Sequence, residues 1–193
     1  MKLKGIFIPV LLFFSSILSA QNYAIDSGHS TVQIQVDRFG VVDVVGRFKA
    51  ISGTIAYDAD APDKTMANAI IQVDSYDANN AGGEAAVKSK AFLDAATYPE
   101  IRFSAKETMV KDGKQYFRGD LTIHGITKEV QLPFSIKGPL LDLPTKKQSI
   151  AFTSSITINR QDFGIRFNAK LPSGTSIVGD EVKITLIILA LAE

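Results

Sequence analysis

Hydrophobic and polar residues alternate along most of the chain after residue 20, which is the pattern of half-buried β-strands. The alternation is clearest in residues 116–137, where apolar side chains occupy every second position on both sides of Gly125. Glycine supplies the backbone freedom that a tight turn needs. The stretch therefore predicts a β-hairpin, with His124 at the end of its first strand and on the outward face.

The same alternation recurs in residues 32–37, 51–58, 101–106 and 150–159, and turn sequences rich in Asp, Gly and Pro separate these runs. Residues 82–99 differ, because they are rich in alanine and lysine and lack the alternation, so we expect one or two short helices there. About eight strands at this spacing predict a closed antiparallel barrel or a sandwich. We therefore expect a single all-β domain, an eight-stranded antiparallel barrel with a short helical insertion.

The inward positions decide whether such a barrel is filled or hollow. An eight-stranded barrel has an interior just wide enough to be filled by side chains or to hold one small ligand. The expected inward positions mix large residues, such as Phe103 and Phe152, with small ones, such as Gly53 and Ala105, and this mixture fits both cases. Arg38 shares the inward parity of its strand, and a lone buried cation is costly. Either the strand ends before Arg38, or Arg38 lies at a mouth that faces an acidic group or a ligand head.

The first 20 residues have the composition of a secretory signal peptide. Lys2 and Lys4 precede an apolar run at residues 5–14, and small residues follow up to Ala20. We predict a signal peptide at residues 1–20, a mature domain at 21–193 and a periplasmic location. Leu18 is large for its place before the expected cleavage site, so an uncleaved anchor is an open alternative. The apolar run is short for a membrane span, so we expect no stable membrane insertion after the signal is removed.

The net charge and the candidate catalytic residues argue against two classes of function, nucleic-acid binding and catalysis. The chain carries 21 basic and 20 acidic residues, and loss of Lys2 and Lys4 leaves 19 minus 20, a net charge of −1. This balance gives no electrostatic reason to expect a nucleic-acid partner. His29 and Ser30 are neighbours on an expected strand, where their side chains point to opposite faces and cannot form a catalytic pair. We therefore predict no catalytic residue, no metal site and no enzymatic activity.

Several short motifs together identify a resemblance. The chain resembles the YceI-like family, periplasmic polyisoprenoid-binding proteins with a lipocalin-like barrel. The similar pieces, in order, are Tyr23-Ala24-Ile25-Asp26 with His29-Ser30, Gly46-Arg47-Phe48 with Gly53, Phe92-Leu93-Asp94 with Tyr98-Pro99, Gly119-Asp120-Leu121-Thr122-Ile123-His124-Gly125-Ile126-Thr127-Lys128, Arg160 with Asp162-Phe163-Gly164-Ile165, and Val178-Gly179-Asp180-Glu181-Val182.

The resemblance implies a long apolar tunnel that holds an isoprenoid, quinone-like or fatty-acid-like molecule, with no other cofactor, and it leaves a homodimer open. Two segments depart from the family pattern, Arg38-Phe39-Gly40 and residues 83–88, and both remove polar groups that the family places near the barrel end. A filled barrel that serves as a structural or stress-linked interaction module is the alternative. The expected ligand-binding residues share the inward parity: Val32, Ile34, Val36, Arg38, Ile55, Tyr57, Ile71, Phe103, Phe117, Leu121, Phe134 and Phe152.

Overall fold

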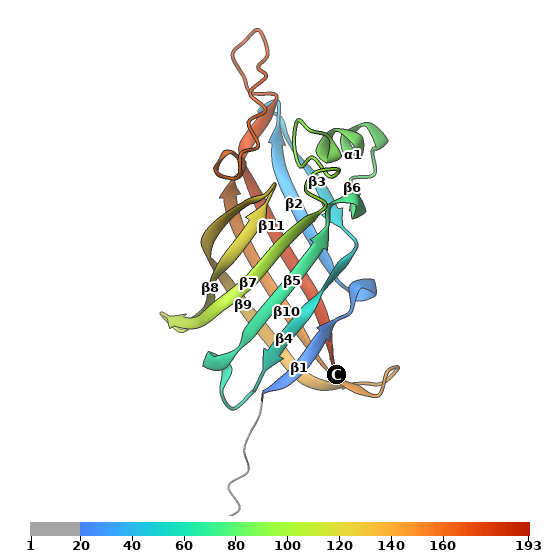
Figure 1. Ribbon diagram of the computed structural model, residues 1–193, viewed down its shortest axis with the longest axis vertical. Helices are drawn as coiled ribbons and strands as arrows, with labels where there is room; N and C mark the ends of the chain where they lie inside the picture. Colours follow the sequence, from blue (N-terminus) through green and yellow to red (C-terminus); the bar gives the residue numbers. More distant parts are fainter. Residues whose placement is uncertain (1–19) are drawn as a thin grey trace, which may run out of the picture.

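The chain folds into a tall β-barrel, seen in a computed structural model that describes residues 20–193 (Figure 1). The predicted signal peptide lies outside the described residues, apart from Ala20. The strands are β1 (Gln21–Ile25), β2 (Thr31–Arg38), β3 (Val42–Phe48), β4 (Ile51–Tyr57), β5 (Met66–Gln72), β6 (Tyr76–Asp77), β7 (Glu100–Lys111), β8 (Lys114–Ile123), β9 (Ile126–Asp142), β10 (Lys147–Asn159) and β11 (Val178–Ala192). The helical elements are α1 (Ala81–Lys88) and the 3-10 turns η1 (Ser27–His29), η2 (Pro62–Lys64), η3 (Val73–Ser75) and η4 (Arg160–Phe163).

Eight antiparallel strands close the barrel, in the order β1-β4-β5-β7-β8-β9-β10-β11 and back to β1. The last strand closes the barrel through its C-terminal end, because one edge of this strand has two successive partners. Residues 178–187 of β11 pair with β2, whereas residues 190–192 pair with β1. The predicted all-β, eight-stranded antiparallel barrel is confirmed.

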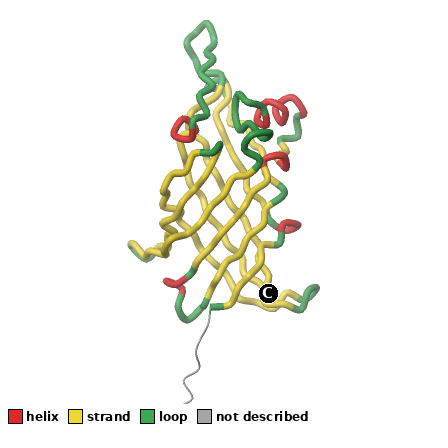
Figure 2. The backbone as a smooth tube through the Cα atoms, viewed as in Figure 1, coloured by secondary structure: helices red, strands yellow, loops and turns green. Residues whose placement is uncertain are grey.

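Three further strands form a flap beside β11. β2 pairs with β3 over its whole length, but β3 contacts β6 only through Arg47 and Phe48. The outer edge of β3 from Val42 to Gly46 therefore lacks a strand partner among the described residues. This edge lies beside α1 at one end of the barrel (Figures 1 and 2). We call the end of the barrel beside α1 the helix end. The opposite end, where β1 begins and the chain terminates, is called the closed end.

The hairpin and the helical insertion form where the sequence predicts them, but β8 ends at Ile123, so His124 is a turn residue and not the end of the strand. His124 and Gly125 join β8 to β9 with φ of 50° and 73°, values typical of a two-residue hairpin turn. The ring of Tyr98 packs against His124 at 4.5 Å between centroids, and a side chain at Gly125 would collide with it. α1 begins one residue before the predicted segment, where Asn80 caps it by accepting hydrogen bonds from two backbone amides. No helix within residues 20–193 is long and apolar enough to cross a membrane.

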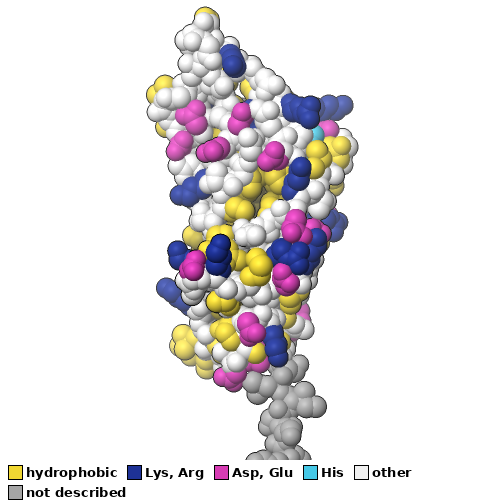
Figure 3. Space-filling view, turned by 90° about the vertical axis from the view of Figure 1, so that its left-hand side faces the viewer, with side chains coloured by type: hydrophobic (Ala, Val, Ile, Leu, Met, Phe, Trp, Pro, Cys, Tyr) yellow, Lys and Arg dark blue, Asp and Glu magenta, His cyan; other side chains and the backbone are white. Residues whose placement is uncertain are grey.

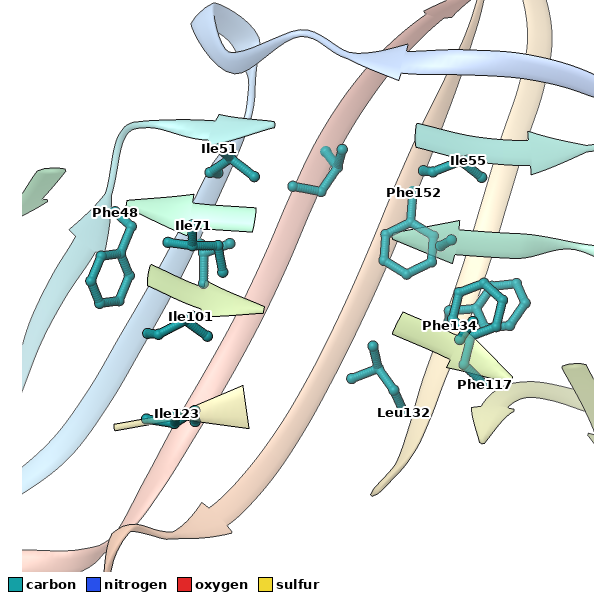
Figure 4. Close-up of a cluster of buried hydrophobic side chains, with 14 of the residues drawn as sticks. Phe48, Ile51, Ile55, Ile71, Ile101, Phe117, Ile123, Leu132, Phe134 and Phe152 are labelled. Atoms are coloured by element: carbon teal, nitrogen blue, oxygen red, sulfur yellow. The ribbon is translucent and has the colours of Figure 1, made fainter. Parts of the chain in front are cut away.

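Aromatic residues fill the closed end of the barrel. Phe117 is fully buried and stacks on Phe134 at 4.1 Å between ring centroids, with Phe152 beside both rings. Figure 4 shows these three rings close together near Ile55 and Leu132. The outside of the barrel carries basic and acidic side chains interspersed, as one face shows (Figure 3). Close packing at this end leaves the helix end as the place where the interior can be open.

A buried arginine fixes the long loop at the helix end. Arg160 donates hydrogen bonds to the carbonyl oxygens of Ile165, Phe167 and Gly179 and to the Asp180 carboxylate, at 2.7–2.9 Å. Its charge is thus paired and its donors are used, as a buried cation requires. The arginine therefore anchors residues 164–177 above the barrel interior.

Candidate ligand-binding cavity

A cavity of about 500 Å³ occupies the interior between the aromatic floor and the helix end. Its volume lies within the range of about 300–1,000 Å³ that is usual for small-molecule sites. The lining is almost wholly aliphatic and aromatic, and only Asp37, Arg38, Tyr76, Asn80 and Arg160 contribute polar side chains. A space with this lining favours a hydrocarbon over water, because water needs polar partners to remain there.

Several inward side chains of the barrel face the cavity without being fully buried, as expected for an interior that is hollow rather than filled. Ile34, Ile156, Ile184 and Leu186 all line the cavity and are only partly buried. In contrast, Ile150 on the same inner face near the closed end is 1% exposed. The barrel therefore has a packed closed end and an open chamber above it.

Ten of the twelve residues that the sequence selects for ligand binding line this chamber: Val32, Ile34, Val36, Arg38, Ile55, Ile71, Phe103, Phe117, Leu121 and Phe152. Phe117 and Phe152 form its floor. The assignment of these residues to ligand contacts stays a prediction, but the structure brings them around one space.

The other two residues, Tyr57 and Phe134, are not among the lining residues of the cavity. Phe134 sits below the chamber, stacked on Phe117. Tyr57 ends β4 at the closed end, paired through its backbone with Gln21. Both side chains have the parity of the lining residues, but their position along the barrel axis puts them beyond the floor.

The chamber reaches solvent between β3 and α1. Val44 and Val45 line the cavity and are also 38% and 48% exposed. Across from them, Asn80 and Gly83 of the α1 segment complete the rim. A ligand chain can therefore enter beside the unpaired edge of β3, without passing through the packed end.

Arg38 lies at this mouth. It is the last residue of β2, so the expectation that the strand ends before it is wrong. Its side chain is exposed, and the guanidinium lies 4.2 Å from the centre of the Phe39 ring. The cation remains hydrated while its stem contacts an apolar surface, which removes the cost of burial.

Several cavity residues were absent from the expected ligand-binding set and appeared in the sequence only as parts of family motifs. Phe92 and Leu93 from the insertion and Phe163 and Ile165 from the loop after β10 close the helix end. The rings of Phe92 and Phe167 pack at 5.0 Å, which ties the insertion to that loop. The signals available in the sequence were the apolar run at residues 91–93 in the insertion and the apolar residues Phe163, Ile165 and Phe167 in the loop.

The two histidines serve the scaffold. His29 Nδ1 lies 2.7 Å from Asp26 Oδ2, and this hydrogen bond raises the pKa of His29 and lowers the pKa of Asp26. The Ser30 hydroxyl instead bonds to the backbone of Leu189, so His29 and Ser30 diverge as expected. Residues 20–193 contain no group of three or more His, Cys, Asp or Glu side chains that could hold a metal ion.

The chain forms an antiparallel barrel around an apolar chamber, and comparison with known proteins gives its family. Residues 23–190 match the YceI-like domain, and the chain belongs to this family. A UPF0312 protein of Pseudomonas savastanoi pv. phaseolicola is 33% identical over 152 residues, which cover 76% of this chain and 78% of that protein. The UPF0312 protein plu2095 of Photorhabdus laumondii is 30% identical over 166 residues, with 85% and 86% coverage.

Solved structures have the same fold. The crystal structure of Burkholderia cenocepacia BcnA superposes with a TM-score of 0.74 at 26% identity and covers 86% of this chain and 99% of BcnA. A polyisoprenoid binding domain from Saccharophagus degradans, implicated in plant cell wall breakdown, gives a TM-score of 0.66 at 13% identity, with 89% and 98% coverage. At that identity the second likeness concerns the fold alone.

Proposed function

We propose that this protein is an exported binding protein that holds a long-chain amphiphile in its apolar chamber for transport, storage or sequestration. The ligand class is a polyisoprenoid, a quinone-like molecule, or a fatty acid or amide. The single observation that carries the proposal is the apolar cavity of about 500 Å³ above the packed floor. The fold shared with a polyisoprenoid binding domain supports the same ligand class. No step of this function requires catalysis.

Burial of the hydrocarbon supplies the affinity. Each CH₂ group removed from water contributes about 0.8 kcal/mol, so ten groups supply roughly 8 kcal/mol before the costs of ordering. Few polar contacts at the mouth are then needed to orient the head group. A partner identified by this chemistry is a flexible apolar chain with one polar end.

The most direct test is the mass of a co-purified ligand. Protein purified without detergent and extracted with organic solvent should release an apolar molecule of a few hundred daltons, as judged by mass spectrometry. A filled barrel that acts as an interaction module would release none and would gain no thermal stability from prenyl compounds.

A matched pair of variants locates the bound chain. Leu186 points into the chamber and Ile187, its neighbour on β11, is 53% exposed on the outside. Leu186→Trp should weaken binding of the fluorescent apolar probe N-phenyl-1-naphthylamine by about tenfold or more, because the larger ring occupies the chamber, whereas Ile187→Trp should change it less than about twofold. Equal effects of the two substitutions would contradict binding in the chamber. The native chain has no tryptophan, so emission from each introduced indole also reports its environment.

A periplasmic location and a homodimer belong to the same proposal. Cell fractionation tests the first, and size-exclusion chromatography with light scattering tests the second.

A further inference from the structure

Tyr76 lies on the inner face of the flap, at the mouth of the chamber. Its backbone pairs with Phe48, the two rings are 5.3 Å apart between centroids, and the residue is only 6% exposed. Gly46 makes room for the phenol, since a Cβ atom at that position would lie 2.1 Å from the tyrosine hydroxyl. The missing side chain at Gly46 thus creates a slot that directs the hydroxyl along β3 toward Val44.

The hydroxyl of Tyr76 is the buried polar group of the lining that lacks a protein partner within residues 20–193. Asp37 accepts a hydrogen bond from a turn amide, Asn80 caps α1, and Arg160 is fully engaged by the loop. Arg38 is exposed to solvent at the rim. Each of these four groups is therefore satisfied without a ligand.

The same hydroxyl retains contact with open space. Within residues 20–193 the fully enclosed side-chain oxygens without a hydrogen bond are Thr31 Oγ1 and Ser154 Oγ, and Tyr76 is not one of them. The tyrosine is one of the residues that line the cavity, which is the space that the ligand would occupy. A hydroxyl that lacks a protein partner but can be reached from the cavity can donate a hydrogen bond to a ligand oxygen at this point.

The surroundings select a neutral head group. Burial raises the pKa of Tyr76, and the nearby Glu84 carboxylate raises it further, so the phenol stays protonated and donates. Glu84 also accepts a hydrogen bond from the backbone of Ala78, which holds its negative charge beside the slot. That charge repels an anionic head from this position.

We infer that Tyr76, in the slot above Gly46, donates a hydrogen bond to a neutral carbonyl or hydroxyl oxygen at the head of the bound amphiphile. This inference rests on the proposed function and names the head group that the chamber prefers. The apolar chain lies below, on the aliphatic lining, and a ketone, amide or alcohol head is held beside α1. A carboxylate or phosphate head is disfavoured at this site.

The test uses two probes that differ in one oxygen: geranylgeranylacetone, a ketone on a prenyl chain, and the hydrocarbon in which a methylene replaces its carbonyl. Affinities are measured by displacement of N-phenyl-1-naphthylamine. Tyr76→Phe keeps the ring and removes the donor, so it should weaken ketone binding about three- to tenfold and change hydrocarbon binding less than about twofold. Tyr57→Phe, outside the chamber lining, is the control and should change neither.

The outcomes separate this inference from the function on which it rests. Equal loss for ketone and hydrocarbon, or no loss for either, in Tyr76→Phe would overturn the assignment of the donor without contradicting the proposed function. Failure of the native protein to bind both probes would overturn the proposed function and the inference with it. Gly46→Ala displaces the phenol by sterics alone and should reproduce the selective loss for the ketone; unchanged ketone affinity would count against the slot.

Discussion

Two phenylalanines test whether the barrel has a packed floor and an open chamber. Both residues line the chamber, but Phe117 is fully buried within the aromatic stack of its floor, whereas Phe103 is only partly buried. The rings are 6.0 Å apart between centroids, so the two sites share one neighbourhood. Substitution of either residue by alanine removes the same atoms, so the two variants differ only in the environment from which the ring is removed.

The expected costs follow from that difference. Full burial of a phenylalanine side chain is worth about 1.5–3 kcal/mol, and a new cavity in a tightly packed site adds to the loss. Phe117→Ala should therefore lower the free energy of unfolding by about 3–5 kcal/mol. In Phe103→Ala the protein loses only part of the free energy gained by removing the ring from water, and little new cavity opens because the Phe103 ring already faces open space. The cost of this substitution should therefore be about 2 kcal/mol or less.

Urea unfolding followed by far-UV circular dichroism measures both values. The comparison is valid if the slope of the free energy against urea stays the same in the two variants. Equal losses of about 3–5 kcal/mol would mean that the interior is packed uniformly, and the hollow-chamber account would fail.

Two further predictions concern polar contacts of Arg160 and Asp26, which are outside the expected ligand-binding set. Arg160→Met should lower the free energy of unfolding by about 2–4 kcal/mol and speed amide hydrogen exchange in residues 164–177, because buried carbonyls lose their donor. Arg166→Met changes an exposed residue of the same loop and should have neither effect. Equal exchange rates in the two variants would contradict the anchoring role of Arg160. Asp26→Asn should lower the pKa of His29 in an NMR titration, because the hydrogen bond from Asp26 is what raises it. Because the pKa of His29 is raised, the contact stabilises the fold below the pKa of the unfolded histidine, and this stabilisation is lost as pH rises through the folded pKa. Because the pKa of Asp26 is lowered, the contact stabilises the fold above the pKa of the unfolded aspartate, and this stabilisation is lost as pH falls through the folded pKa. An unchanged His29 pKa in the variant would exclude the contact.

Local patterns predicted the strands and their inner face because each strand needs only its own period-two alternation to present an apolar side. The same holds for the hairpin at Gly125, where the turn chemistry is local. Tyr57 and Phe134 show the limit of this reasoning. Their parity gives the face correctly, but alternation carries no information about depth along the barrel axis, so the floor of the chamber was invisible in the sequence.

The remaining features depend on contacts between distant segments. Closure arises because the end of β11 pairs with β1 while the rest of the same edge pairs with β2, and no residue pattern within β11 indicates these two partners. The slot for Tyr76 needs Gly46 from another strand, and the mouth needs α1 beside the free edge of β3. Arg160 was noted only as part of a family motif, since its hydrogen bonds to loop carbonyls exist only after the loop folds back.

Intermolecular NMR contacts measure the central claim directly. With methyl-labelled protein and unlabelled geranylgeranylacetone, isotope-filtered NOE spectra should connect the prenyl chain to the methyl groups of Ile34, Ile156 and Ile184 inside the chamber. They should show no contact with Ile150 in the packed end or with Ile187 outside the barrel. Contacts with Ile187 alone, or no contacts at a concentration that saturates binding, would contradict an apolar chamber that accepts a lipid chain.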